Sequence, residues 1–205
     1  MTRLIYSSPG VSLFAMISFA LSPLGFRIFK LSIVVVILSL SGLLAGAITA
    51  QAQQASQVKA AFLFNFAKFV EWPPGAFVND QAAIILCFSD RDPMAEALEA
   101  LRGKVVQGRR LEIRRCRGPE DYRGCQIFFA SASERTGLPQ IIGSLRNSPV
   151  LTVTEEVDNF AKLGGIINLI VAEGKIRFEI SLQNARRSGL KISSQLLKLA
   201  MTVEE

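Results

Sequence analysis

The stretch GGIINLIVAEGKIRFEISL, Gly164 to Leu182, decides the fold. Two apolar, β-branched runs, Ile166–Val171 and Lys175–Leu182, flank the dipeptide Glu173-Gly174. Two such runs joined by a short turn that ends in glycine predict a β-hairpin. Any sheet that contains this hairpin is therefore at least partly antiparallel.

Upstream of the hairpin, predicted strands alternate with predicted helices. Three short apolar runs are typical of strands covered on both faces: Ala82–Phe88, Gln126–Ala130 and Pro149–Val153. Arg109–Cys116 alternates apolar and charged residues, which indicates a strand with one wet face. Helices are expected after three of these strands, over Asp92–Leu101, Ser133–Leu145 and Glu155–Leu163.

Two further helices are predicted at the ends of this region. Ala55–Trp72 carries apolar residues at three- and four-residue spacing and stops at Pro73. Asn184–Met201 is predicted as the last helix, with Gly189 as a break within it. We therefore predict an α/β fold, a single-domain mixed β-sheet of about six strands flanked by about five helices on both faces.

The N-terminal segment has the pattern of an export signal. Leu31–Leu44 is an apolar run of 14 residues that follows two basic residues, and a small-residue segment ends at Ala52. This combination predicts a signal peptide over residues 1–52, cleaved between Ala52 and Gln53. The run is shorter than the roughly 20 residues of a membrane-spanning helix. The mature domain would then be residues 53–205, in a bacterial periplasm.

A second apolar stretch, within residues 1–26, precedes this signal. One interpretation is an N-terminal extension upstream of a true start at Met16. The other is an uncleaved membrane hairpin that anchors the domain. Neither apolar run alone reaches the length of a membrane-spanning helix, which counts against the hairpin.

Charge and composition exclude several classes of function. Three of the 23 basic residues lie in the predicted signal, which leaves 20 against 17 acidic residues and a net charge of +3. That balance does not indicate nucleic-acid binding. The chain has no histidine, so the usual Ser/His and Cys/His pairs and most zinc sites are excluded. We predict no catalytic residue, no cofactor and no metal, and hence a protein that is not an enzyme.

Three fragments resemble the YfiR family. They are VKAAFLFNFAKFVEWP (Val58–Pro73), the hairpin stretch already quoted, and ARRSGLKISSQLLKLA (Ala185–Ala200). The resemblance runs from Val58 to Ala200 and identifies residues 53–205 as a YfiR-like domain. Proteins of this family are periplasmic, and those of its best-understood branch repress an inner-membrane diguanylate cyclase.

The resemblance implies regulation by binding. The partner would be the periplasmic domain of a membrane diguanylate cyclase, a GGDEF protein, and repression would lower cyclic di-GMP and biofilm formation. The alternative is a periplasmic small-molecule sensor module for a histidine kinase or another envelope system. The segment Phe62–Phe69 carries several aromatic residues, and exposed aromatic area there would favour a homodimer.

The chain has three cysteines, Cys87, Cys116 and Cys125. In an oxidising compartment an odd count predicts one disulfide and one free thiol. Neighbouring strands can bring Cys87 and Cys125 within bonding reach, whereas a Cys116–Cys125 pair would close a shorter loop, and three reduced cysteines are the remaining alternative. The resemblance implies the pair Cys87–Cys125, with Cys116 as the free thiol.

Polar residues at the ends of two apolar helices suggest a ligand or partner cleft. Glu71 and Trp72 end the first helix, and Ser193 and Ser194 are polar points in the last one. If these regions meet, the four residues would line a cleft; helix capping and surface placement are the alternatives. The arginines of Arg109–Arg117 predict an edge strand protected by charge, or a surface for an anionic partner.

Overall fold

The computed structural model describes residues 51–89, 92–134 and 136–205. The predicted signal core and the extension 1–26 lie outside the described residues. The chain divides into two units, residues 1–52 and 53–205, and the second unit is the domain described below. Among the described residues, no helix combines the length and apolar character that crossing a membrane requires.

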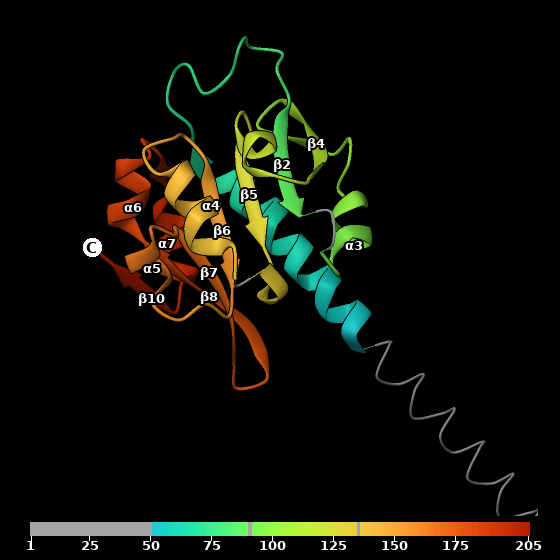
Figure 1. Cartoon of the computed structure of the whole chain (residues 1–205), viewed down its shortest axis with the longest axis vertical. Helices are drawn as coiled ribbons and strands as arrows, with labels where there is room; N and C mark the ends of the chain where they lie inside the picture. Colours follow the sequence, from blue (N-terminus) through green and yellow to red (C-terminus); the bar gives the residue numbers. More distant parts are fainter. Residues whose placement is uncertain (1–50, 90–91, 135) are drawn as a thin grey trace, which may run out of the picture. The chain divides into compact units, whose positions relative to one another are not determined.

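The centre of the domain is a mixed sheet of eight strands within the described residues (Figure 1). In spatial order the strands are β10 (Thr202–Glu204), β8 (Lys175–Ser181), β7 (Ile167–Ala172), β6 (Leu151–Glu155), β5 (Ile127–Ala130), β2 (Ile84–Ser89), β4 (Arg109–Cys116) and β3 (Val105–Val106). The pairings from β7 through β6, β5 and β2 to β4 are parallel. The predicted hairpin β7–β8 is antiparallel. The predicted mixed α/β fold is therefore confirmed.

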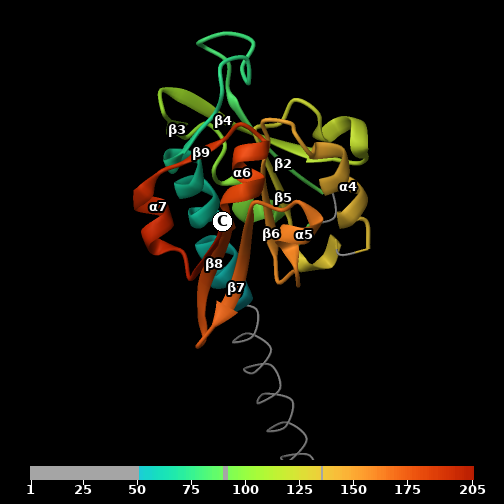
Figure 2. The same cartoon turned by 90° about the vertical axis from the view of Figure 1, so that its left-hand side faces the viewer.

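Helices cover both faces of the sheet (Figures 1 and 2). On one face lie the helix over residues 51–69, α3 (Ala95–Glu99), α6 (Leu182–Arg187) and α7 (Ser194–Leu199). On the other face lie η1 (Pro119–Tyr122), α4 (Leu138–Leu145) and α5 (Phe160–Leu163). A short 3-10 turn, η2 (Ala132–Glu134), follows β5.

Each face of the sheet has its own hydrophobic cluster, because successive strand residues point to opposite sides. In β2, Leu86 and Phe88 pack towards the helix over residues 51–69, while Cys87 packs towards η1 and α4. In the first cluster the rings of Phe66 and Phe178 meet edge to face, with centroids 5.1 Å apart. This contact attaches the first helix to the hairpin.

The prediction of one helix over Asn184–Met201 is wrong. The chain leaves α6 at Gly189, whose φ of +70° favours glycine, and a Cβ there would lie 3.3 Å from Pro73. It then forms β9 (Lys191–Ile192), which pairs antiparallel with β1 (Val70–Glu71). Ser193 begins the next helix, because its side chain accepts a hydrogen bond from the Leu196 N–H. The apolar spacing alone did not reveal this interruption.

Other boundaries also differ from the prediction; α4, for example, begins at Leu138 rather than at Ser133. The first helix ends at residue 69 and the chain continues as β1, so Trp72 lies beyond it. The helix predicted over Glu155–Leu163 is reduced to α5, since Glu155 is the last residue of β6. The two- and three-residue strands were not predicted, because so short a segment shows no periodicity.

Candidate functional site

A cleft of about 450 Å³ lies at the amino ends of β2, β5 and β6. Its lining comes from the loop before β2, from the segment that leads into β5, and from the segment that leads into β6: Phe77, Val78, Ile85, Gly124, Gln126 and Pro149. Residues 73–83 form that first loop, which projects from one end of the domain in Figure 1. Sequence analysis missed this cleft, although a long loop after Pro73 was a signal for it.

Gln126 holds the base of the cleft together. It is 6% exposed, and its side-chain amide donates to the carbonyl of Ala76 in the loop at 3.0 Å. Its side-chain oxygen accepts from the Ile85 N–H at 2.9 Å. The Trp72 indole N–H donates to the Gln126 backbone carbonyl at 3.2 Å. One buried amide therefore links the loop, β2 and the start of β5.

Arg109 fixes the loop from outside. Its guanidinium donates to the carbonyls of Asn79 and Ala82, at 3.0 and 2.8 Å. The same group lies 3.9 Å from the centroid of the Phe77 ring, a cation–π contact. The Trp72 ring meets Phe77 edge to face at 6.1 Å. The loop is thus held in place by one cation and two aromatic rings.

The lining of the cleft is largely uncharged. Its walls are mostly apolar, with Glu112 and Arg123 as the charged residues of its lining. A site of this volume and character is typical of small-ligand recognition.

The segments of the four residues proposed for a cleft do lie side by side. Glu71 pairs with Lys191 in the β1–β9 ladder, and the Ser193 N–H donates to the carbonyl of Phe69 at 2.9 Å. Ser193 caps α7, Ser194 is its exposed first residue, and Trp72 turns towards Phe77. Of the four, only Trp72 contacts the lining of the cleft described above. Their role as a ligand or partner site stays a prediction.

The three cysteines converge beneath η1. The structure joins Cys87 and Cys125 in a disulfide with a Cα–Cα distance of 6.0 Å. Cys116 is a buried free thiol. The three sulfur atoms all lie within 4.8 Å of one another. The pairing agrees with the one that the family resemblance implied, and the spare thiol lies against the bridge rather than apart from it.

One backbone oxygen lies close to all three sulfurs. The carbonyl oxygen of Asp121 is 4.0 Å from the sulfur of Cys87, 3.5 Å from that of Cys116 and 3.6 Å from that of Cys125. Burial, and next the negative charge of Asp121, raise the pKa of the Cys116 thiol to about 11. The thiol is therefore almost entirely protonated at neutral pH.

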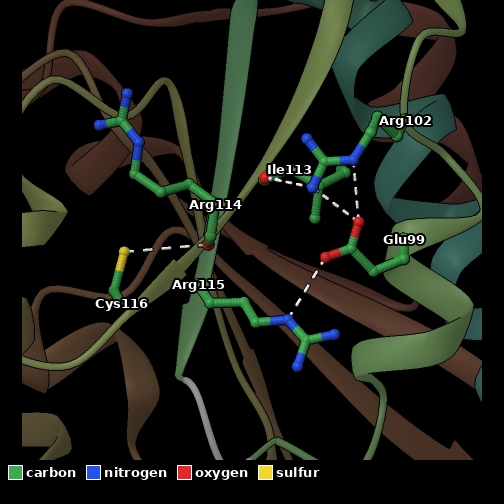
Figure 3. A network of polar contacts seen from close by, with 6 residues as sticks. All are labelled: Glu99, Arg102, Ile113, Arg114, Arg115 and Cys116. Carbon is green, nitrogen blue, oxygen red and sulfur yellow. Dashed lines mark hydrogen bonds and ion pairs between the residues drawn. The ribbon is translucent and has the colours of Figure 1, made fainter.

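Arg115 of β4 and Arg102 belong to a charged network on the face of the strand opposite Cys116 (Figure 3). Glu99 of α3 accepts from Arg102 at 2.6 Å and from Arg115 at 3.3 Å, and these partners lower the pKa of Glu99 although its partial burial acts to raise it. Arg114 points away from this network towards the side of Cys116. β3 pairs with Arg109 and Arg110 at the edge of the sheet. Whether the arginines of β4 protect this edge or form a surface for an anionic partner stays a prediction.

At the carboxyl ends of the same parallel strands, polar side chains of the described residues bind within the protein. Asp92 is 4% exposed and accepts from the N–H groups of Met94 and Ser131, at 2.8 and 3.3 Å. Burial raises the pKa of Asp92. Nearby, Lys59 of the first helix forms an ion pair with Glu155 at the end of β6. Ligands in open α/β sheets usually bind at this end, but here its polar groups bind one another.

Comparison with solved structures finds distant likenesses. A conserved domain protein from Vibrio cholerae is 13% identical, with a TM-score of 0.44, over 63% of this chain and 57% of that one. An ABC domain from Streptococcus pneumoniae, in complex with L-Trp, is 12% identical, with a TM-score of 0.41, over 62% and 57%. The chain thus spans less than two thirds of either protein.

The sheet order, its two helical layers and the single disulfide define a small mixed α/β domain. Residues 56–201 match the family described as YfiR/HmsC-like. The chain belongs to this family, and the resemblance noted in its sequence is confirmed.

Proposed function

We propose that this protein is a periplasmic regulatory binding protein that represses an inner-membrane diguanylate cyclase and so lowers cyclic di-GMP. The match of residues 56–201 to the YfiR/HmsC-like family carries the proposal. The family is regulatory and periplasmic, and its members suggest control of diguanylate cyclases. The partner would be the periplasmic domain of a GGDEF protein.

The cysteine pair supports export as part of this proposal. The Cys87–Cys125 disulfide spans 38 residues. Such a bond persists in an oxidising compartment, whereas in the cytosol the two cysteines would be kept as reduced thiols. Repression would then require the chain to be on the outer side of the inner membrane, where it meets only the outward-facing part of the cyclase.

A deletion strain tests this function. Cyclic di-GMP and surface attachment should rise when the gene is removed, and a copy of the whole chain should restore both to their original levels. The matched control is a chain in which residues 2–52 are removed, so that the same domain stays in the cytosol. It should restore neither. An unchanged cyclic di-GMP level in the deletion strain would refute the repressor role.

A small-molecule sensor module is the second candidate, and the cleft of about 450 Å³ favours it. In that case the deletion would leave cyclic di-GMP unchanged, while the purified protein would bind a small apolar ligand. Replacing Gln126 by Ala should weaken such binding, because the loop carbonyl of Ala76 loses its donor.

The predicted homodimer is a further part of the proposal. Phe66 is buried, and Phe62, Phe64 and Phe69 pack half-buried against the first hydrophobic cluster. Most of this aromatic face therefore stabilises the domain itself. Light scattering of the purified protein over a range of concentrations will show whether a dimer forms, and a monomer at every concentration would refute it.

A further inference from the structure

The cysteine cluster contains a disulfide and a thiol in mutual reach. Each pair of its three sulfur atoms is within 4.8 Å, and all three surround the carbonyl oxygen of Asp121. Cys116 is buried at 1% exposure. A thiol held in this position has one obvious reaction partner, the Cys87–Cys125 bond.

The sheet register decides which sulfur Cys116 can bond. Cys87 on β2 and Cys116 on β4 are not opposite one another, because Ser89 is the partner of Cys116. Two residues of stagger and one strand spacing place the Cα atoms of Cys87 and Cys116 about 8 Å apart. That distance is beyond the roughly 7 Å that a disulfide spans without backbone movement.

Cys125 has no such restriction. It precedes β5 and lies outside the paired part of the sheet. It is nine residues from Cys116, and η1 forms the connection between them. A Cys116–Cys125 bond would therefore join two ends of one short loop rather than two staggered strands.

We propose that Cys116, Cys87 and Cys125 form a thiol–disulfide exchange site with two pairing states, Cys87–Cys125 and Cys116–Cys125. The Cys116 thiolate attacks the Cys125 sulfur, the Cys116–Cys125 bond forms, and the Cys87–Cys125 bond breaks. The electron pair leaves with Cys87, which takes up the proton that Cys116 released. No oxidant or reductant is consumed.

The exchange acts on the wall of the cleft. Cys125, Gly124 and Arg123 line it, so moving the tether of Cys125 from β2 to β4 changes that wall. In the loop-entropy model, a bridge across 38 residues raises the free energy of the unfolded chain more than a bridge across nine residues, whereas the two pairing states of the folded chain differ in local strain. The inference concerns chemistry within the chain and does not depend on the identity of the partner.

Disulfide mapping of the purified oxidised protein tests the proposal. Samples held between about pH 7 and about pH 9 are quenched with acid, unfolded, alkylated and mapped by mass spectrometry. Alkylated Cys87 and a Cys116–Cys125 peptide should appear together and level off at the same fraction of the molecules. Their rate of appearance should rise about tenfold per pH unit, because only the thiolate attacks. Alkylation of Cys116 alone at every pH and time would overturn the proposal.

Two single variants form a matched pair. Cys87→Ser leaves Cys116 and Cys125, which should form a disulfide on mild oxidation. Cys125→Ser leaves Cys87 and Cys116, which should stay reduced at least tenfold longer, given their stagger. Equal oxidation rates in the two variants would refute the assignment of Cys125, rather than Cys87, as the sulfur that Cys116 bonds. If either variant fails to fold, the pH series on the wild-type protein decides the question alone.

Discussion

The two ends of the parallel strands differ in how their polar groups are used. At the amino ends, Gln126 and Arg109 bind carbonyls of the loop over residues 73–83, and an open cleft remains beneath it. At the carboxyl ends, Asp92 and the Lys59–Glu155 pair are satisfied within the protein. The long loop over residues 73–83 contributes much of the lining of the cleft at the amino ends. The described residues thus leave an open cleft at the amino ends, whereas the polar groups at the carboxyl ends bind one another.

Removing the disulfide should have the largest effect. In the loop-entropy model, the double variant Cys87→Ser/Cys125→Ser loses about 4 kcal/mol of unfolding free energy, because its unfolded chain is no longer cross-linked. Urea unfolding followed by circular dichroism measures the loss. Cys116→Ala is the control and should lose about 1 kcal/mol, as a small buried group is deleted. Equal losses would show that the bridge stabilises the domain no more than the packing of one small side chain does.

Replacing Gln126 by Ala should have the next largest effect. The Ile85 N–H and the Ala76 carbonyl lose their partners, which costs about 2–3 kcal/mol in unfolding free energy. Hydrogen exchange of residues 75–83 should become faster. The exposed Gln183 on α6 provides the control, and Gln183→Ala should change neither quantity. Unchanged exchange in the loop would refute the role assigned to Gln126.

Replacing Arg109 by Lys should have a smaller effect and lower the free energy of unfolding by about 1 kcal/mol. Lysine keeps the charge but loses the planar group that lies over Phe77 and donates to two carbonyls. Hydrogen exchange should again increase in the loop and not at the carboxyl ends. Replacing the exposed Arg110 by Lys should change neither the hydrogen exchange of the loop nor the free energy of unfolding. A uniform increase over the whole domain would contradict the separation of the two ends.

The smallest effect concerns Asp92 at the carboxyl ends and appears in the pH dependence of the free energy of unfolding. Burial, assisted by the charge of Glu155, raises the pKa of Asp92 above 3.8 in the folded state. Between that value and the folded pKa, the folded protein binds more protons than the unfolded chain, so stability falls as pH rises and then levels off. The free energy of unfolding of the Asp92→Asn variant should not fall in this way as pH rises. Unfolding free energies of both proteins between about pH 4 and about pH 7 will show it, and a wild-type stability that rises relative to the variant would contradict the prediction.

Local pattern predicted the main strands well, and failed where tertiary contacts act on short segments. Arg109–Cys116 has in the structure the bounds read from its alternating residues, and the turn at Glu173-Gly174 connects β7 to β8. The break at Gly189 was noted in the sequence, but not the strand β9 that follows. Two residues form a strand there because β1 is beside them, and no periodicity of the segment itself contains that information.

The candidate site was less accessible to sequence analysis. The cysteines were identified, but Gln126 and Arg109 were not, because each acts on a loop 27 to 50 residues away along the chain. Trp72 was proposed to line a cleft with Glu71, Ser193 and Ser194, whereas its ring packs on Phe77, which lines the cleft at the amino ends of the strands. A glutamine inside an apolar run was the signal that could have pointed to a buried hydrogen-bonding role.

The sequence by itself determined the α/β class, the hairpin and the family, since these depend on residue spacing and on fragments that are contiguous in the chain. Only the tertiary structure decided that the cleft lies at the amino ends of the strands and that Cys116 touches the disulfide. The reason is physical: side chains from β2, β4 and the start of β5 meet across strands whose register is set by packing of both sheet faces, and that register is a property of the assembled sheet.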